Sequence, residues 1–560
     1  MKIILAQQNY HIGNFEYNLE KIKTAINEAI EKKSDLIVFS ELAICGYPPR
    51  DFLGFEDFYE QCQHSIQALL PLSKNIGILI GAPSKNPTIE GKDLFNAAYL
   101  LYEEEIKGIA HKTLLPTYDV FDEYRYFEPA YDWNVLEFKG KKLAVTICED
   151  IWNLGNNPLY RICPMDKLMA FNPDVMINLS ASPFDYTHAQ DRKAIAKANV
   201  KKYKIPLLYC NAVGSQTEIV FDGGSLCFDK NANLICEASY FEESNCEINL
   251  TDDNEILEKI IVQENKISNE ELNPTTYNAS LNIDRIYNAL IMGIKDYFQK
   301  MGFTKAILGS SGGVDSALTL ALACDALGSE NVTAVLMPSQ FSSDHSVSDA
   351  VQLSKNLNNP YHIVEIKPIY DSFMNQLKPI YLDLPFSLAE ENIQARSRGN
   401  LLMAIANKFN MILLNTSNKS ELATGYGTLY GDMAGGIAVL GDVYKMQVYS
   451  LVNYINRDKE IIPKHIYTKA PSAELRPNQK DSDSLPDYAI LDAILYQYIE
   501  HRKGPKEIKA MGFDENLVDR VLKMVNKNEY KRNQFCPIIR VSPKAFGVGR
   551  RVPIVAKYLS

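Results

Sequence analysis

A Gly-rich stretch near the middle of the chain constrains the fold more than any other feature. Residues 305–320 have the sequence KAILGSSGGVDSALTL, which is an apolar run, a loop of serines and glycines, and an apolar segment with helical spacing. This order predicts a strand, a tight loop and a helix. Backbone N–H groups in such a loop, with the positive end of the helix dipole, form a concave site for phosphate oxygens. The stretch therefore predicts a phosphate site at a strand end, unless it is only a turn into a buried helix.

The residues of this loop also indicate a metal ion. No Lys-Ser or Lys-Thr pair follows the glycines, so the loop is not a Walker A motif. Asp315 instead brings a carboxylate beside the phosphates, which would repel it unless Mg²⁺ bridged the two. The order SGGVDS resembles the PP-loop of the ATP pyrophosphatase family. This resemblance implies cleavage of ATP to AMP and pyrophosphate, which activates an oxygen of a second substrate.

Composition argues against several classes of function. With 560 residues, 46% of them hydrophobic and 23% charged, the sequence is typical of a soluble protein with two large domains. The formal net charge of −11 argues against nucleic acid as a partner. The first residues, MKIILAQQ, become polar too soon for a signal peptide, and no apolar run approaches membrane-spanning length. The ten cysteines are scattered without a C-x-x-C pair, which predicts mostly reduced thiols. We therefore expect a cytoplasmic protein without membrane or nucleic-acid partners.

Strand-like runs alternate with helical patterns along most of the chain. In the first half, strands are predicted at 2–6, 36–39, 76–80, 97–102, 142–147, 175–179 and 207–210, and helices at 18–31 and 190–203. In the second half, strands are predicted at 305–308, 332–337, 362–365 and 411–415, and helices at 283–301 and 390–409. Continuous apolar strands indicate sheets covered on both faces. Both halves are therefore predicted to be α/β, the second as a doubly wound parallel sheet with the Gly-rich loop at a strand's carboxyl end.

An acidic and polar stretch separates the two halves. It follows Leu250, runs to about residue 274 and contains a helix-like pattern at 255–262. Such a stretch between periodic segments is typical of a connection between domains. We place the junction at about residues 265–280, which gives domains of 1–265 and 280–560.

Three residues of the first half lie at or just beyond predicted strands. Glu41 lies in SELAICGYPP, Lys112 in HKTLLP and Cys148 in ICEDIW. Together they could transfer an acyl group if Cys148 attacked a carboxamide, Glu41 moved its proton and Lys112 stabilised the oxyanion. A lysine close to the thiol would also favour the thiolate. Taken singly, each residue is more often a surface charge or a core cysteine.

As a set, these residues look like the Glu-Lys-Cys triad of the carbon–nitrogen hydrolase (nitrilase) superfamily, over about residues 1–260. The resemblance implies an αββα sandwich that hydrolyses an amide. Glu123 is then either a supporting carboxylate or a surface charge. The positions where the glutamine-using branch holds its substrate are occupied by Tyr118, Ser182 and His188. That branch usually has Lys or Arg in place of His188, and a neutral imidazole binds a carboxylate less firmly than a fixed cation.

Polar stretches beyond the Gly-rich loop carry groups for a nucleotide site. The stretch EENIQARSRG at 390–399, which includes Arg396 and Arg398, places them on a predicted helix, where a solvated face is the alternative. The stretch NTSNKSELATGYGTLYGD at 415–432 follows a strand, where a turn with a helix cap is the alternative. Glu421, if it faced Asp315, would complete an oxygen-rich Mg²⁺ site that keeps several waters. Lys445 and Lys544 could supply positive charge to phosphates.

The motifs SGGVDS, EENIQAR, NTSNKSE and GDVYK are similar to those of the NAD synthetase family, over about residues 280–560. The resemblance implies ATP contacts at Gly309, Ser310, Ser311, Gly312, Gly313, Val314, Asp315, Ser316, Thr416, Lys445 and Ser472, with Met337 near the adenine. It implies contacts to deamido-NAD at Asn392, Glu421, Tyr426 and Lys544, and Mg²⁺ on Asp315 and Glu421. Members of this family assemble as homo-oligomers, so we expect a homo-oligomer here.

The two resemblances together imply a ligase that takes its nitrogen from glutamine. Cys148 would release ammonia by way of a glutamyl thioester, and the nicotinate carboxylate of deamido-NAD would attack the α-phosphate of ATP. Ammonia would then displace AMP and form NAD. Free ammonia would be protonated in bulk water, so an enclosed path for it is also expected. The alternatives are a PP-loop amidotransferase for another acid, and an ammonia-dependent synthetase with an idle nitrilase-like domain.

Overall fold

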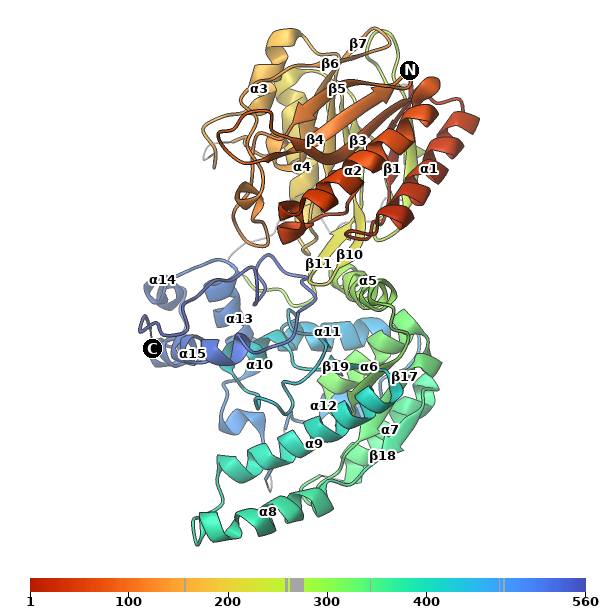
Figure 1. Cartoon of the computed structure of the whole chain (residues 1–560). Helices are drawn as coiled ribbons and strands as arrows, with labels where there is room; N and C mark the ends of the chain where they lie inside the picture. Colours follow the sequence, from red (N-terminus) through yellow and green to blue (C-terminus); the bar gives the residue numbers. More distant parts are fainter. Residues whose placement is uncertain are drawn as a thin grey trace. The chain divides into compact units, whose positions relative to one another are not determined.

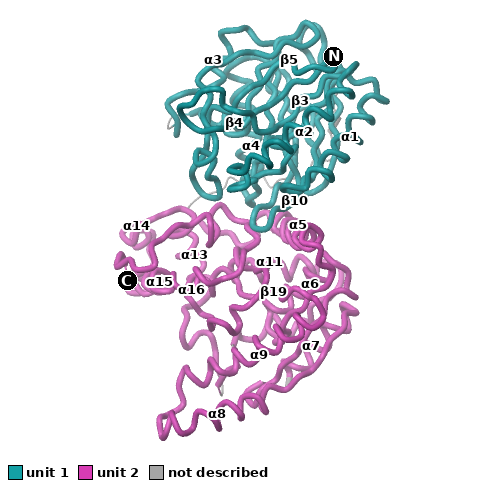
Figure 2. Tube along the Cα trace, in the orientation of Figure 1, with its two compact units in different colours: residues 1–267 teal, residues 268–560 magenta. Residues whose placement is uncertain are grey.

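A computed structural model describes residues 1–155, 158–256, 260–261, 276–342, 344–472, 474–476 and 479–559. The chain divides into two compact units, residues 1–267 and 268–560 (Figure 2). Within the described residues, no helix combines the length and the apolar character needed to cross a membrane.

Unit 1 is built on two mixed β-sheets. The first has the strand order β14 (Ser244–Asn249), β1 (Lys2–Gln7), β2 (Leu36–Val38), β3 (Gly77–Lys85), β4 (Leu94–Tyr102) and β5 (Glu105–His111). The second has the order β15 (Ile260–Ile261), β13 (Leu234–Glu237), β12 (Leu226–Phe228), β9 (Leu207–Asn211), β8 (Val175–Ser180), β7 (Lys141–Ile147) and β6 (Leu136–Phe138). A separate hairpin consists of β10 (Val213–Gln216) and β11 (Ile219–Asp222). The central strands β1, β2 and β3 are parallel, as are β7, β8 and β9.

Side chains that alternate along the strands of unit 1 show which layer each face of a sheet packs against. Its helices are α1 (Phe15–Glu31), α2 (Glu56–Leu69), α3 (Pro164–Leu168) and α4 (His188–Tyr203). Ile3 and Leu5 of β1 share a buried cluster with Val145 and Ile177 of the second sheet. Ile4, which points the other way, packs with residues of α1 and α2 instead. The outer face of the second sheet packs against α3 and α4. The two sheets therefore lie between layers of helices (Figure 1), which confirms the predicted αββα sandwich.

Unit 2 is built on a parallel sheet whose strand order reverses near its middle. The order is β18 (Tyr361–Ile363), β17 (Val332–Leu336), β16 (Ala306–Gly309), β19 (Ile412–Asn415) and β20 (Ile437–Ala438). The chain moves outward from β16 to β18 and then returns to β19 on the other side of β16. In such sheets, ligands bind at the carboxyl ends of the strands where the order reverses. Ala306, Ile307 and Leu308 are all buried, so both faces of β16 are covered. The predicted doubly wound sheet is confirmed.

Helices of unit 2 pack against the strand that precedes the Gly-rich loop and around the segment that follows β19. They are α5 (Ile283–Met301), α6 (Val314–Leu327), α7 (Asp344–Leu357), α8 (Lys367–Tyr381), α9 (Leu388–Phe409), α10 (Lys419–Thr424), α11 (Lys445–Ile455), α12 (Lys464–Thr468), α13 (Tyr488–Ile499), α14 (Pro505–Ala510), α15 (Glu515–Lys527) and α16 (Glu529–Arg532). On α9, Leu402 and Ala406 pack against Ile307 of β16. On α10, Leu422 packs in a second cluster with residues of α13 and α15. The segment that follows β19 is therefore buried against its own helical layer.

One predicted element is wrong. The pattern at 255–262 predicts a helix, but Ile260–Ile261 forms β15, which pairs in parallel with β13. Residues 257–259 and 262 of this prediction lie outside the described part of the chain, as does most of the predicted junction at 265–280. β-Branched residues favour strands, and the backbone groups of Ile260 and Ile261 gain hydrogen-bonding partners at the edge of β13.

Candidate active sites

Glu41, Lys112 and Cys148 come from three different strand ends of unit 1. Glu41 follows β2, Lys112 follows β5 and Cys148 follows β7. The Lys112 Nζ donates a hydrogen bond to Glu41 Oε1 at 2.7 Å. The charges of Glu41 and Lys112 both act on the Cys148 thiol, and all three side chains are buried. The fold therefore brings an acid–base group, a cation and a thiol into one buried cluster.

Fixed donors orient the Glu41 carboxylate. Its Oε1 accepts a second hydrogen bond, from Asn96 Nδ2 at 2.7 Å, and its Oε2 accepts the Ala181 N–H at 3.0 Å. Asn96 lies inside β4, and Ala181 follows β8 directly. The carboxylate is thus held by groups from both sheets, as a general base must be held near the proton that it takes.

Glu123 belongs to the same cluster. Its Oε1 accepts hydrogen bonds from Lys112 Nζ at 2.8 Å and from the Tyr47 hydroxyl at 2.7 Å. Burial raises the pKa of Glu123 to about 7, although Lys112 opposes the shift. Burial alone would lower the pKa of Lys112, but Glu123 and Glu41 outweigh burial and raise that pKa. Lys112 therefore stays charged at neutral pH, and Glu123 is a buried partner of this cation rather than a surface charge.

Cys148 lies in a left-handed backbone turn and is protonated at rest. It begins the short 3-10 helix η4 (Cys148–Ile151) with a φ of +42°, a region that non-glycine residues rarely occupy. Burial and the negative charge of Glu41 raise the pKa of the Cys148 thiol, and Lys112 opposes them only in part. Lys112 favours the thiolate, as expected from the sequence. Burial and Glu41 outweigh this effect, so the pKa of the thiol is raised. A base must therefore take the proton before the sulfur can attack.

Two pairs of polar side chains come from segments next to this cluster. The Tyr118 hydroxyl lies within hydrogen-bonding distance of both carboxylate oxygens of Glu149, at 3.0 and 2.9 Å. Ser182 Oγ and His188 Nε2 lie 2.9 Å apart. Burial raises the pKa of Glu149, which follows the nucleophile directly in the chain. The sequence interpretation missed Glu149, although its place beside Cys148 was an available signal.

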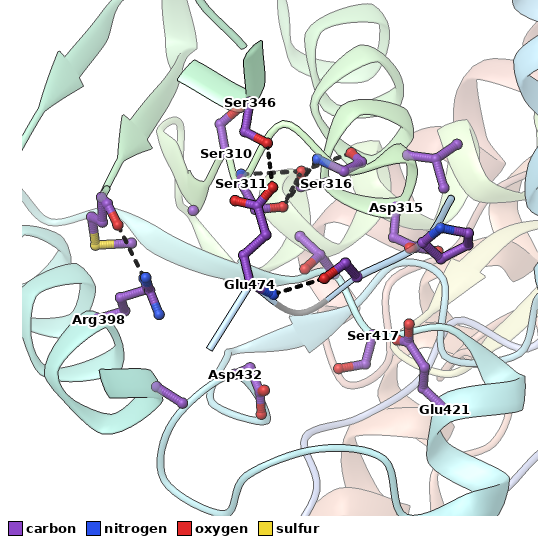
Figure 3. A pocket seen from close by; sticks show the side chains of 18 of the residues that line it. Ser310, Ser311, Asp315, Ser316, Ser346, Arg398, Ser417, Glu421, Asp432 and Glu474 are labelled. Carbon is purple, nitrogen blue, oxygen red and sulfur yellow. Dashed lines mark hydrogen bonds between the residues drawn. The ribbon is translucent and has the colours of Figure 1, made fainter. Parts of the chain in front are cut away.

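In unit 2, the loop between β16 and α6 borders a cavity of about 300 Å³ (Figure 3). The Ser311 and Ser316 Oγ atoms lie 3.1 Å apart, and Ser316 Oγ donates to the Gly313 carbonyl at 3.0 Å. The Ser310 N–H donates to the Val335 carbonyl at 2.9 Å. Gly313 is the N-cap residue of α6, so the positive end of this helix dipole lies at the loop. Serine hydroxyls and a helix N-terminus therefore lie together at one cavity, an arrangement suited to phosphate oxygens.

Two carboxylates and a lysine lie at the same cavity. Lys445 Nζ lies 2.5 Å from Asp315 Oδ2 and 3.8 Å from Glu421 Oε1. Asn418 joins the two acids, because its Nδ2 donates to Asp315 Oδ1 at 2.9 Å and its N–H donates to Glu421 Oε2 at 3.2 Å. Burial raises the pKa of Glu421 to about 8, and the charge of Asp315 adds to this shift. Asp315 and Glu421 therefore face a common point, where a cation is strongly favoured.

Most residues expected to bind ATP border this cavity. They are Gly309, Ser310, Ser311, Gly313, Val314, Asp315, Ser316, Thr416, Lys445 and Ser472. Met337, Glu421 and Tyr426 border it as well. Gly312, Asn392 and Lys544, all in the described part of the chain, are not among its lining residues. The Asn392 side chain instead accepts a hydrogen bond from Thr428 Oγ1 at 2.8 Å.

The cavity also has lining residues to which the sequence interpretation gave no specific role. Arg398 donates from Nε to the Met337 carbonyl at 3.0 Å, and burial lowers the pKa of Arg398 to about 10. Ser346 Oγ donates to Glu474 Oε1 at 2.6 Å. Figure 3 shows Ser346 and Glu474 beside Ser310 and Ser311 of the Gly-rich loop, and Arg398 on another side of the cavity. Arg398 belongs to the polar stretch at 390–399, whereas the sequence analysis gave no sign of Glu474.

Comparison with known proteins covers both units. A carbon-nitrogen hydrolase model matches residues 2–252, and an NAD synthase model matches residues 286–535. A glutamine-dependent NAD(+) synthetase of Synechocystis sp. is 43% identical over 566 residues, which cover 99% of each chain. The chain belongs to the glutamine-dependent NAD(+) synthetase family. A relative of the same name in Acinetobacter baylyi is 41% identical over 99% of this chain and 98% of its own.

Solved structures of glutamine-dependent NAD(+) synthetases have a similar fold. The enzyme from Acinetobacter baumannii, in complex with adenosine diphosphate, is 38% identical with a TM-score of 0.76, over 99% of this chain and 98% of that chain. The Glu41 cluster lies in the part matched by the carbon-nitrogen hydrolase model, and the Gly-rich loop lies in the part matched by the NAD synthase model. Each of the two candidate sites thus lies within the part of the chain that one family model matches.

Gly312→Ala is expected to raise the KM for ATP at least about tenfold. Gly312 has a φ of +75°, and a Cβ there would clash with the backbone carbonyl of Ser346 on α7. The loop would have to move away from α7, which displaces the N–H groups that we expect to bind phosphate. Gly302→Ala is the matched control, because Gly302 also has a φ of +75° but open space around its Cβ position. Steady-state kinetics would contradict this account if both variants kept the wild-type KM.

Lys419→Met is expected to lower the free energy of unfolding of unit 2 by about 3–5 kcal/mol. The Lys419 Nζ is completely buried, and it donates to Glu500 Oε1 at 2.8 Å and to the Lys544 carbonyl at 2.9 Å. Its removal would leave Glu500 and Asp442, 2.9 Å from the ammonium group, without a buried cation. Urea unfolding measures the effect, with the exposed Lys459→Met as control. Equal midpoints for the two variants would contradict a structural role of this ion cluster.

Proposed function

We propose that this protein amidates deamido-NAD to NAD with nitrogen from glutamine, while ATP is cleaved to AMP and pyrophosphate. The observation that carries the proposal is the pairing, on one chain, of a buried Glu-Lys-Cys cluster with a phosphate loop that faces two carboxylates and a lysine. Its membership of the glutamine-dependent NAD(+) synthetase family supports the same activity. In this proposal, residues 1–265 form the glutaminase domain and residues 280–560 the synthetase domain.

The glutaminase step begins with proton transfer. Glu41 takes the proton of the Cys148 thiol, and the sulfur attacks the carboxamide carbon of glutamine. Lys112 stabilises the oxyanion, because two carboxylates keep it charged at neutral pH. The protonated Glu41 returns its proton to the leaving nitrogen, so ammonia departs and a glutamyl thioester remains. Water then attacks this thioester, with Glu41 again as the base, and glutamate and the thiol are released.

Groups near the thiol fit the charged end of glutamine. Glu149 and Tyr118 offer acceptor oxygens for the α-ammonium group. Ser182 and His188 offer donors for the α-carboxylate. We propose that these four side chains hold glutamine so that its amide lies at Cys148.

The synthetase step joins two anions and therefore needs positive charge. The N–H groups and serine hydroxyls of the Gly-rich loop bind phosphate oxygens, and Lys445 neutralises part of their charge. The nicotinate carboxylate attacks the α-phosphorus of ATP, so a carbon-oxygen-phosphorus link forms and pyrophosphate leaves. Ammonia attacks the activated carbonyl carbon, AMP leaves, and a proton is lost to give the amide of NAD.

The proposed Mg²⁺ site consists of Asp315 and Glu421. Their fit to the ion rests on the proximity of the two carboxyl groups, because the charge of Asp315 adds to the raised pKa of Glu421. In the described residues no three His, Cys, Asp or Glu side chains converge for a metal ion, so phosphate oxygens and water would complete the ligands. When bound, Mg²⁺ supplies the charge that lets a carboxylate approach a polyphosphate. The positive charge of Lys445 lies 2.5 Å from Asp315 Oδ2 and 3.8 Å from Glu421 Oε1, so it also acts on both carboxyl groups.

The remaining parts of the proposal concern deamido-NAD and assembly. Asn392, Tyr426, Lys544 and Glu421 are proposed to contact deamido-NAD. We also propose a homo-oligomer, which light scattering would test, and a cytoplasmic location, which fractionation would test.

An enclosed path for ammonia is tested by competition, because added labelled ammonium should enter NAD less readily than glutamine nitrogen does.

The acceptor is tested by supplying ATP, Mg²⁺ and ammonium with a panel of acids and measuring AMP release. We expect AMP with deamido-NAD and an equal amount of NAD. AMP release with another nucleotide acid, and none with deamido-NAD, would leave the ATP chemistry in place but overturn the substrate. Glutamate release from glutamine by the same protein distinguishes an active glutaminase from an idle one.

A further inference from the structure

The pair formed by Ser182 and His188 contains a group that changes charge in the physiological pH range. An imidazole loses its proton between about pH 5 and pH 8, unlike the guanidinium or ammonium groups that usually bind carboxylates. The side chain of His188 is 24% exposed, so it can exchange protons with water, whereas Ser182 is buried. The pair therefore has two hydrogen-bonding states at pH values where the enzyme would work.

Both residues are tied to the catalytic cluster through short segments. Ser182 follows Ala181, whose N–H holds the Glu41 carboxylate, and the Ser182 N–H donates to Asn211 Oδ1 at 2.9 Å. The His188 ring stacks on Trp152, with centroids 4.9 Å apart and planes 13° from parallel. Trp152 is the C-cap residue of η4, the helix that Cys148 begins. The pair therefore has a fixed position relative to the nucleophile.

The charge of His188 decides which atom of the pair can donate to a ligand. In the neutral tautomer with its proton on Nδ1, toward Asp185, Nε2 accepts the Ser182 hydroxyl proton at their 2.9 Å separation, which occupies that donor. In the imidazolium, both ring nitrogens are donors, so Nε2 donates to Ser182 Oγ and the hydroxyl proton becomes available. Protonation therefore adds both a positive charge and a free hydroxyl donor for a carboxylate ligand.

Charged groups of both signs lie near His188, and the cation on its own helix, Arg192, is paired with Asp222 Oδ1 at 2.6 Å. Asp185 Oδ2, on the segment before α4, lies 3.9 Å from His188 Nδ1, and Asp185 Oδ1 accepts from the Thr187 N–H at 2.9 Å. Asp191 lies on the next turn of α4. From η4, which packs against α4, the carboxylate of Glu149 is bonded to Tyr118. The strands β9 and β12, which α4 also contacts, carry no charged residue.

Resting on the proposed glutaminase function, we infer that His188 sets the affinity for glutamine through its charge. The site binds the α-carboxylate tightly when the imidazole is protonated and weakly when it is neutral. The glutamine-dependent reaction thus loses affinity for its nitrogen donor as the pH rises.

The test is equilibrium binding to a Cys148→Ala protein, which cannot hydrolyse its ligand. Calorimetry measures the Kd of L-glutamine, and of 4-aminobutanamide, which lacks the α-carboxylate. Between about pH 6 and about pH 8, the Kd of glutamine is expected to rise about tenfold. The Kd of 4-aminobutanamide is expected to change less, and this ligand also reports any titration of Glu149.

His188→Arg in the same background is the deciding variant, because a guanidinium keeps its charge over this range. Its glutamine Kd is expected to vary less than about twofold with pH, at a value near that of the parent at low pH. A flat Kd in the parent, or an unchanged pH dependence in His188→Arg, would overturn the inference while leaving the glutaminase function in place. If the parent bound no glutamine at any pH and the wild type released no glutamate, both would be overturned.

Discussion

Cys148→Ala is expected to lower glutamine-driven NAD formation at least about 1,000-fold and to leave ammonium-driven formation within about twofold of the wild type. In the proposed mechanism the thiol forms a covalent bond to the glutamine carbon, and the proposal includes no second thiol or hydroxyl nucleophile in the cluster. Glu41, Lys112 and Glu123 are held by one another and by Asn96, Ala181 and Tyr47, so the cluster should keep its shape without the sulfur.

The matched control for this variant is Cys163→Ala. Cys163 is half-buried in the same unit, and its sulfur lies 3.2 Å from the Tyr203 hydroxyl, away from the Glu41 cluster. It is expected to retain both reactions. Glutamine-driven synthesis by Cys148→Ala at the wild-type rate would show that Cys148 is not the nucleophile.

Lys445→Met is expected to lower NAD formation at least about 100-fold with either nitrogen source. Lys445 is a buried cation beside Asp315 and Glu421, and burial lowers its pKa less than these carboxylates raise it. Methionine keeps most of the side-chain volume but removes the charge, so the two carboxylates would repel each other and the phosphates. The loss should therefore appear in ammonium-driven assays, where Cys148 has no part.

Lys459→Met is the control for the loss of a lysine, because Lys459 is exposed. Thermal unfolding of both variants separates loss of function from loss of fold. Wild-type rates for Lys445→Met with both nitrogen sources would contradict the proposed role of this lysine at the phosphates.

The motif residues of the first unit could be predicted because strand ends carry them. Glu41 and Cys148 follow strands that the sequence pattern predicts, whereas Lys112 follows β5, which the pattern does not predict. The strands belong to two different sheets, so the meeting of the three residues depends on how the sheets pack on each other. Asn96 and Ala181 could not be predicted. The first lies inside an apolar strand and the second acts through its backbone N–H, so neither has a local signal.

The direction of the pKa shift of the Cys148 thiol could not be predicted from the sequence either. The presence of Lys112 suggests a thiolate at Cys148, but burial and the carboxylate of Glu41 dominate once the chain is folded. In unit 2, the pattern around β16 and α6 was sufficient to predict the Gly-rich loop. The place of Glu474 beside Ser346 depends on contacts between segments more than 100 residues apart, which local periodicity does not describe.

The helix predicted at 255–262 shows why local patterns fail near the edges of sheets. Short apolar runs fit a helix or a strand equally well, and the choice depends on what the run can pair with. Here, Ile260–Ile261 pairs with the backbone edge of β13, a partner that the sequence around residue 260 does not reveal.

The most direct test of the central claim is the fate of the glutamine amide nitrogen. The wild-type protein would be given deamido-NAD, ATP, Mg²⁺ and glutamine labelled with ¹⁵N in its amide group, and the products would be analysed by mass spectrometry. The proposed function predicts ¹⁵N-labelled NAD, with one AMP and one pyrophosphate for each NAD formed. Unlabelled NAD, or ATP converted to ADP and phosphate, would contradict it.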